Sequence, residues 1–233
     1  MRAALGFLTV VGGATPRDDR APAWFGMVGA LVGLAVGGAW WVAGELWPAL
    51  LAAVIAVAVD AALTGFLHMD GLADSADGLL PPVDRARRLA IMAAPDVGAF
   101  GAAALVVVLV TRVAALAALT PDVLLVAGLW AASRAGMGVT MGLVPYARDD
   151  GMASGFAGRS VAPSAVTAVV ALAVVAVTLG GWAGPATALA AAGGFAAVVT
   201  LAVRRVGGYT GDVLGAAGVV AETVGLLVAA ARW

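Results

Sequence analysis

The densest group of chemically useful side chains in the sequence is His68-Met69-Asp70-Gly71-Leu72-Ala73-Asp74-Ser75-Ala76-Asp77-Gly78. Its aspartates are spaced so that a helix would bring all of their carboxylates to one face, where like charges repel one another. A divalent cation would relieve that repulsion, and carboxylate oxygens suit Mg²⁺, which usually keeps waters and bridges to substrate phosphates. The segment therefore predicts a magnesium-phosphate site with Asp70, Asp74 and Asp77 as ligands. The alternative is a solvated loop beside a membrane, which the apolar and small residues between the aspartates disfavour.

His68 is the only histidine in the chain. An imidazole at this position could act as a base, as a donor to phosphate or as a metal ligand. A lone histidine at a helix end also commonly serves as an interfacial hydrogen-bonding group. The sequence leaves these roles open, and His68 joins the predicted catalytic residues.

Four more charged residues stand inside apolar stretches: Asp60, Arg112, Arg134 and Glu222. Charges inside a membrane are costly and face a polar interior or a partner. Asp60 either belongs to the acidic site or pairs with Arg112 or Arg134. We expect Arg112 to form an ion pair with Asp60 or Glu222. We expect Ser133 and Arg134 to bind substrate, because a guanidinium grips phosphate with two parallel hydrogen bonds.

Two further segments have the chemistry of anion binding. Tyr146 and Arg148 lie in a glycine-rich, cationic stretch that suits an anionic substrate, although a loop on the cytoplasmic side of a membrane would look similar. Thr210, Gly211 and Asp212 open the last apolar stretch, where a helix N-terminus would bind phosphate or a metal. Simple N-capping by Asp212 fits the same residues. We predict substrate contacts from Tyr146, Arg148, Thr210 and Gly211, and a metal contact from Asp212.

The elements that must position these residues are membrane helices. Of the 233 residues, 63% are hydrophobic and 12% are charged, with a mean hydropathy of +1.03, whereas a soluble domain carries about 25% charged residues. The net charge of −1 excludes a generally basic nucleic-acid-binding protein. The absence of cysteine and lysine excludes disulfides, thiolate metal sites and lysine Schiff bases.

A membrane-spanning helix needs about 20 mainly apolar residues, and about seven stretches qualify. We therefore expect an all-α, polytopic transmembrane bundle forming one domain, 1–233, with 1–23 as an interfacial segment and 68–96, 145–163 and 204–212 as cytoplasmic loops. The expected spans are Phe25–Gly44, Trp47–Leu67, Val97–Leu119, Val123–Val144, Ala165–Trp182, Pro185–Val203 and Val213–Ala231.

Arginine placement sets the expected orientation, because loops rich in arginine stay in the cytoplasm. With a cytoplasmic N-terminus, nearly all arginines outside the spans fall on the inner side, which predicts a cytoplasmic active face on a bacterial inner membrane. Gly29, Gly33 and Gly37 have the spacing of closely packed helices, so we assign them a packing role. The inner arginines are Arg2, Arg17, Arg20, Arg85, Arg87, Arg88, Arg148, Arg159, Arg204 and Arg205.

Taken together, these segments resemble the adenosylcobinamide-GDP ribazoletransferase family, also called cobalamin(-5′-phosphate) synthase, over essentially the whole chain. Residues 65–78 match its H-x-D-G-x-x-D-x-x-D-G signature. The chain departs from the family at Ala93-Ala94-Pro95-Asp96, where a basic residue and Asp-Ser are usual, and at Gly218-Val219-Val220, where a glutamate is common. Further matches are Asp84-Arg85, Ile91-Met92, Gly98, Gly101, Ser133-Arg134, Tyr146-Ala147-Arg148, Gly151, Thr210–Ala216 and Glu222.

The resemblance implies a membrane-bound, Mg²⁺-dependent transferase that joins adenosylcobinamide-GDP to α-ribazole or its 5′-phosphate and releases GMP. The carboxylates of the acidic segment and Asp212 would hold Mg²⁺, and Arg134 and Arg148 would steady phosphate oxygens. His68 or one aspartate would accept the proton of the attacking hydroxyl. The expected partners are these substrates and the lipid bilayer, and a homo-oligomer is left open.

Three other classes fit less well. The CDP-alcohol phosphotransferase signature D-G-x-x-A-R would put its alanine on Asp74 and its arginine on Ser75, so it fails. A secondary transporter would have ionisable residues near the midplane, often between inverted repeats, whereas the polar residues here gather at span ends and no repeat is visible. A structural scaffold leaves the clustered carboxylates unexplained.

Overall fold

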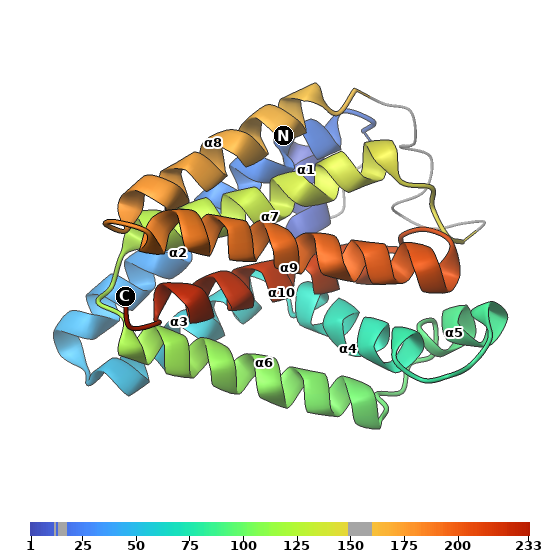
Figure 1. Ribbon diagram of the computed structural model, residues 1–233, viewed down its shortest axis with the longest axis horizontal. Coiled ribbons are helices and arrows are strands. Elements are labelled where there is room, and N and C mark those ends of the chain that lie inside the picture. The colour runs from blue at the N-terminus through green and yellow to red at the C-terminus, as the bar shows by residue number, and fades with distance from the viewer. Residues whose placement is uncertain (12, 14–17, 149–159) are drawn as a thin grey trace.

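The computed structural model describes residues 1–11, 13, 18–148 and 160–233, and within these ranges every regular element is a helix. The predicted all-α class is therefore confirmed. In Figure 1 the long helices lie alongside one another, and α4 and α5 lie at the end of the molecule where α7 and α9 finish. The helices are α1 Arg2–Leu8, the 3-10 helix η1 Ala21–Trp24, α2 Phe25–Leu46, α3 Ala49–Thr64, α4 Leu67–Leu79, α5 Arg85–Ile91, α6 Ala99–Ala118, α7 Val123–Leu143, α8 Ala162–Thr178, α9 Ala183–Val206 and α10 Gly211–Ala229.

Five helices in the described part of the chain are long and apolar enough to cross a membrane: α2 together with η1, α6, α7, α9 and α10. A sixth span results if the bent pair α3–α4 is counted as one, and α8 is shorter, with 17 residues. The expected seven spans are thus not confirmed. The 16 residues of α3 measure about 24 Å, less than the roughly 30 Å of a hydrocarbon core.

A sharp bend separates α3 from α4, whose axes meet at 89°. Gly65 and Phe66 both have φ 60°, and Phe66 is the only non-glycine residue with positive φ among the described residues. Their N–H groups bond to carbonyls of Ala62 and Ala61, which closes the end of α3. The chain then starts a new helix in a new direction.

The segment 68–96, expected to be a polar loop, therefore contains α4 and α5. The reason is a second periodicity in the acidic segment: Met69, Leu72, Ala76 and Leu79 recur at helical spacing and form a buried face. The aspartates occupy the other faces of α4. The prediction that Asp70, Asp74 and Asp77 share a helix is confirmed, and the predicted loop is wrong for this part.

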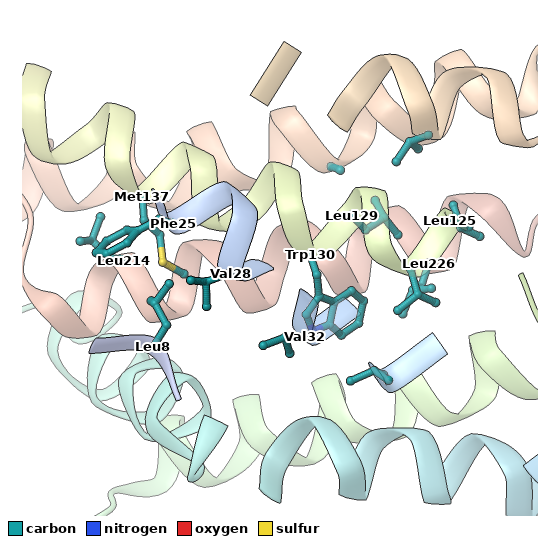
Figure 2. Close-up of a cluster of buried hydrophobic side chains, with 14 of the residues drawn as sticks. Leu8, Phe25, Val28, Val32, Leu125, Leu129, Trp130, Met137, Leu214 and Leu226 are labelled. Atoms are coloured by element: carbon teal, nitrogen blue, oxygen red, sulfur yellow. The ribbon is translucent and has the colours of Figure 1, made fainter. Parts of the chain in front are cut away.

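The packing of α2 on α7 organises the hydrophobic core. A Cβ atom at Gly29 would clash with the Trp130 carbonyl, and one at Gly33 would lie 2.6 Å from the Cα atom of Ala127. Gly37 faces Val123 in the same way. The predicted packing role of these glycines is confirmed, and Figure 2 shows the Trp130 ring beside α2 in the core.

The segment expected to lie at the membrane interface, 1–23, packs on this core in its described part. Leu8 is 2% exposed, and the Phe7 ring stacks on Phe25 with 5.2 Å between centroids. Two arginines used to infer orientation, Arg17 and Arg159, lie outside the described residues, as do Gly151 and most of the segment 145–163. The cytoplasmic N-terminus stays a prediction.

Gly29→Ala should destabilise the protein by about 1–3 kcal/mol, because overpacking against the α7 backbone forces the two helices apart. Gly38→Ala is the matched control on the same helix, where an added Cβ meets no atom within 4 Å. The control should be neutral or stabilising, since alanine favours helix more than glycine by about 0.5–1 kcal/mol. Thermal unfolding in detergent measures both, and equal midpoints would contradict the packing role.

Candidate active site

A cavity of about 160 Å³ lies between α1, α4, α7, α10 and the segment that follows α7. Six of the residues predicted to act in catalysis, substrate binding or metal binding line this cavity. Much of the predicted site is therefore brought together in the fold. These six residues are His68, Asp70, Tyr146, Arg148, Gly211 and Asp212. The remaining lining is mostly apolar and comes from Phe7, Leu8, Leu67, Met137, Leu214 and Gly215.

Close packing of α4 against α10 brings the acidic residues of these two helices together. A Cβ atom at Gly71 would lie 2.8 Å from the carbonyl oxygen of Asp212, and one at Gly215 would lie 3.3 Å from the Cα atom of His68. A side chain at Gly71 would force the helices apart, because its Cβ would meet backbone atoms and not a movable side chain, and one at Gly215 would make a tight contact. Asp70 therefore faces the start of α10 across the cavity.

The carboxylates of Asp70 and Asp212, which line the cavity, and that of Asp74, which does not, repel one another. Burial raises the pKa of Asp74 to about 7, and the negative charges of Asp212 and Asp70 add to that rise, while the Arg148 guanidinium opposes it. Arg148 is also the cation nearest to Asp212, with 3.0 Å between Nη2 and Oδ2. A bound divalent cation would stabilise the ionised carboxylates in the same way.

Asp77, predicted as a metal ligand, makes contacts with the start of α6 that the sequence did not predict. Its two carboxylate oxygens accept hydrogen bonds from the backbone N–H groups of Gly98 and Gly101, at 2.7 and 2.9 Å. Added Cβ atoms at either glycine would collide with this carboxylate, so the glycines make room for it. Asp77, 7% exposed, thus caps the N-terminus of α6. Asp96, considered as a substitute for a family aspartate, is exposed on the neighbouring surface.

The described residues contain no three His, Asp or Glu side chains close enough to hold a metal ion by themselves. Magnesium commonly takes one or two protein carboxylates and completes its shell with water and substrate phosphates. One or two of the carboxylates of Asp70, Asp74 and Asp212 could therefore hold an ion that binds together with a phosphate-bearing substrate, whereas the Asp77 carboxylate already accepts two backbone N–H groups.

A short backbone pairing holds the two loop segments of the site together. The Tyr209 N–H donates to the Pro145 carbonyl at 3.0 Å, and the Ala147 N–H donates to the Tyr209 carbonyl at 2.8 Å. Gly208 permits this contact, because a Cβ atom there would clash with Pro145. The pairing places Tyr146 and Arg148 beside the start of α10. There Thr210, rather than the expected Asp212, is the N-cap, accepting from the Val213 N–H.

Two arginines of α5, for which the sequence predicts no role at the site, brace this arrangement. Arg85 donates to the carbonyls of Val206 and Ala147, at 2.8 and 2.9 Å, and so ties both loop segments to α5. The buried Arg88 donates to the carbonyls of Gly78 and Leu79 at the end of α4. Arg85 belongs to the Asp84-Arg85 match to the family, whereas the sequence signal for Arg88 is its position in an arginine-rich stretch, which equally well indicates membrane topology.

Ser133 and Arg134, predicted to bind substrate, do not line this cavity. Arg134 is 2% exposed and forms an ion pair with the fully buried Glu222, and Ser133 donates to the same carboxylate at 2.6 Å. They belong instead to a charge network inside the bundle. The helical position of Arg134 turns its guanidinium toward Glu222 and Gly218 of α10.

Arg112 is the centre of that buried network. It pairs with Asp60 at 2.9 Å and with Glu222 at 2.6 Å, and its Nε donates to Thr223. The indole of Trp130 donates to the other oxygen of Asp60 at 2.8 Å. Of the alternatives for Asp60, the pairing with Arg112 is therefore the one observed.

His68 is 4% exposed, and its Nδ1 atom has no hydrogen-bond partner among the residues that the structure describes. An unpaired polar atom at a buried position is costly. Because His68 lines the cavity, a substrate group is the natural partner for this nitrogen. This observation favours a catalytic or substrate-binding role over a purely interfacial one.

Glu222→Gln should lower the free energy of unfolding by about 3 kcal/mol, because it leaves the buried guanidinium groups without a neutralising carboxylate. Glu45→Gln makes the same chemical change at an exposed position near the end of α2 and serves as the control. Thermal unfolding in detergent reports the difference. An unchanged midpoint for Glu222→Gln would show that the network does not stabilise the bundle.

The sequence model of the cobalamin-5-phosphate synthase family matches residues 1–230. Proteins named adenosylcobinamide-GDP ribazoletransferase are similar over most of the chain. The one from Bradyrhizobium diazoefficiens is 40% identical over 99% of this chain and 93% of its own, and the one from Citrobacter koseri is 35% identical over 87% and 84%. No solved structure matches. The full-length family match and these relatives establish that the chain belongs to the cobalamin-5-phosphate synthase family.

Proposed function

We propose that the protein is a membrane-bound transferase that joins adenosylcobinamide-GDP to α-ribazole or its 5′-phosphate and releases GMP. It would act as a phosphotransferase of the substituted-phosphate class on the cytoplasmic face of a bacterial inner membrane. The relatives carry the name of this activity. The observation that supports it best is the single cavity that joins an unpaired imidazole to acidic and arginine side chains.

Mg²⁺ bound with the substrate would neutralise charge on the pyrophosphate and on the departing GMP. One or two of Asp70, Asp74 and Asp212 would hold it, with water and substrate oxygens completing its shell. Arg148 would donate hydrogen bonds to a phosphate oxygen of the substrate. Some of its present contact with Asp212 would then be replaced by that phosphate. The start of α10 at Gly211 adds backbone N–H groups and the positive end of a helix dipole, which favour a phosphate at the same place.

The reaction forms a bond between a ribazole hydroxyl oxygen and the phosphorus on the cobinamide side of the pyrophosphate. The bond from that phosphorus to the bridging oxygen breaks, and GMP leaves with the bond's electron pair. His68 would take the hydroxyl proton at Nδ1, which is the atom without a protein partner.

The buried charges argue against the alternative of a secondary transporter. Asp60, Arg112, Arg134 and Glu222 satisfy one another within one network. A transport path needs ionisable groups that face a water-filled route, and these groups are each at most 4% exposed.

Purified protein given adenosylcobinamide-GDP and α-ribazole should release GMP and form the joined cobamide in the presence of Mg²⁺. Omitting Mg²⁺ with a chelator should abolish turnover, and adding the metal back should restore it. Chromatographic detection of GMP and of the cobamide provides independent readouts. The proposal is wrong if no product forms under any metal condition.

The Asp74→Asn and Asp77→Asn variants should separate the metal ligands from the helix cap. Asp74→Asn should lower Mg²⁺-dependent turnover more than about 100-fold, since even outer-shell changes at metal sites cost 10–100-fold. Asp77→Asn should keep the same Mg²⁺ concentration dependence and instead lose about 0.5–2 kcal/mol of stability through its weakened cap. Turnover against Mg²⁺ concentration, together with thermal unfolding, distinguishes the two. A loss of Mg²⁺ dependence only in Asp77→Asn would reverse the assignment.

A further inference from the structure

The guanidinium of Arg148 lies on a segment that belongs to no helix. It reaches Asp212 across the cavity, with 3.0 Å between Nη2 and Oδ2, and its buried Nε has no hydrogen-bond partner among the described residues. A guanidinium binds phosphate with two parallel hydrogen bonds only where its planar fork is correctly oriented. The use of Arg148 in phosphate binding therefore depends on how firmly the backbone beneath it is held.

The backbone of Ala147, directly before Arg148, is bonded on both sides. Its N–H donates to the Tyr209 carbonyl at 2.8 Å, and its carbonyl accepts from Nη2 of Arg85 at 2.9 Å. Because a peptide unit is planar, the carbonyl oxygen of Ala147 and the N–H of Arg148 lie in one plane. The bond from Arg85 thus sets the tilt of the peptide plane from which Arg148 departs.

The Arg85 guanidinium also holds the other loop segment of the site. Its Nε donates to the Val206 carbonyl at 2.8 Å, which belongs to the last turn of α9, where helix carbonyls lack partners within the helix. The chain then turns at Gly207, with φ 80°, and leads into α10. One planar side chain therefore holds both segments whose charged residues, Arg148 and Asp212, form the ion pair of the cavity.

Arg85 is in turn attached to the helix that carries the acidic residues. The N-cap of α5 is Asp84, whose carboxylate accepts from the Arg87 N–H at 2.9 Å. Further along α5, the buried Arg88 donates to two carbonyls at the end of α4. Figure 1 shows α5 beside the end of α4, where α9 also finishes. A continuous set of contacts thus runs from α4, through α5, to the peptide that carries Arg148.

We propose that Arg85 is a positioning residue that acts through Arg148 and orients its guanidinium toward a phosphate group of the donor substrate. This assignment rests on the proposed function and adds a residue from outside the cavity to the same site. The side-chain hydrogen bonds of Arg85 within the described part of the chain go to main-chain carbonyls, and Arg85 does not line the cavity. Its effect on the reaction is therefore transmitted by geometry and not by contact with the substrate.

Steady-state kinetics with adenosylcobinamide-GDP and α-ribazole test the assignment. Arg85→Gln should raise the KM for adenosylcobinamide-GDP and lower its kcat/KM about 10- to 100-fold, because a displacement of about 1 Å from a remote change can cost about 100-fold. The KM for α-ribazole should stay within about twofold of the wild-type value, since that substrate does not depend on Arg148. Arg85→Lys keeps the charge but lacks the planar fork that joins two carbonyls, so its loss should be nearly as large.

Arg87→Gln is the matched control, because it removes the same charge from the same helix. The Arg87 side chain is exposed, and in the part of the chain that the structure describes it makes no hydrogen bond to either loop segment. Its kinetic constants should stay within about twofold of the wild-type values. If the arginines of α5 served only to set membrane topology, Arg85→Gln and Arg87→Gln would have equal effects.

A double-mutant cycle with Arg148→Gln identifies the residue through which Arg85 acts. In the Arg148→Gln background, Arg85→Gln should change kcat/KM by less than about twofold, because the group that it positions is gone. Equilibrium dialysis with GMP gives the same cycle without turnover: each single change should weaken binding, and the double change should weaken it no further than Arg148→Gln alone. Fold losses that multiply in both measurements would show that Arg85 acts independently of Arg148 and would overturn the assignment.

The controls separate a failure of this assignment from a failure of the proposed function. A wild-type protein that releases GMP, together with an Arg85→Gln variant that behaves like Arg87→Gln or loses equally for both substrates, overturns only the assignment. A wild-type protein that releases no GMP overturns the proposed function, and the dialysis cycle still tests the link between Arg85 and Arg148.

Discussion

A guanidinium group inside an apolar helix bundle is tolerated only where carboxylates neutralise it and acceptors take its N–H groups. Arg112 meets that condition with groups from α3 and α10, and its partner Glu222 in turn holds Arg134 of α7. Removing any one helix would leave an unpaired charge, so α3, α6, α7 and α10 must converge here. The network therefore fixes α10, which carries part of the site at its other end.

The other elements of the active site pack against α10. Gly71 and Gly215 let α4 lie directly on α10, which brings the carboxylates of two helices to one cavity. The pairing between Pro145 and Tyr209 then aligns the segment after α7 with the start of α10. Helix packing, backbone pairing and charge neutralisation thus each contribute a separate part of the arrangement, and Phe7 and Leu8 of α1 pack at its edge.

Much of this arrangement could be predicted from local sequence. Spacing alone put Asp70 and Asp74 on one helix, and composition indicated an all-helical membrane protein. Prediction failed where a role depends on which distant element lies opposite. Asp77 continues the helical spacing of Asp70 and Asp74, yet its carboxylate accepts hydrogen bonds from two backbone N–H groups at the start of α6. Nothing local indicates that Arg134 faces Glu222 and not the cavity, and nothing in α1 indicates that it reaches the acidic segment.

Two arginines of α5 contact the backbone of neighbouring segments, whereas the ion pairs of the buried network join side chains. The side chains of Arg85 and Arg88 donate to main-chain carbonyls, at Val206, Ala147, Gly78 and Leu79. Every amino acid carries such a carbonyl, so exchanging the side chains at Val206, Ala147 and Leu79 leaves the acceptors in place, whereas a side chain at Gly78 would collide with Met92. At those three positions the contacts of Arg85 and Arg88 depend on the path of the backbone and not on the identity of the residue. The loops around the site can vary in side-chain chemistry while their shape is held by two residues outside them.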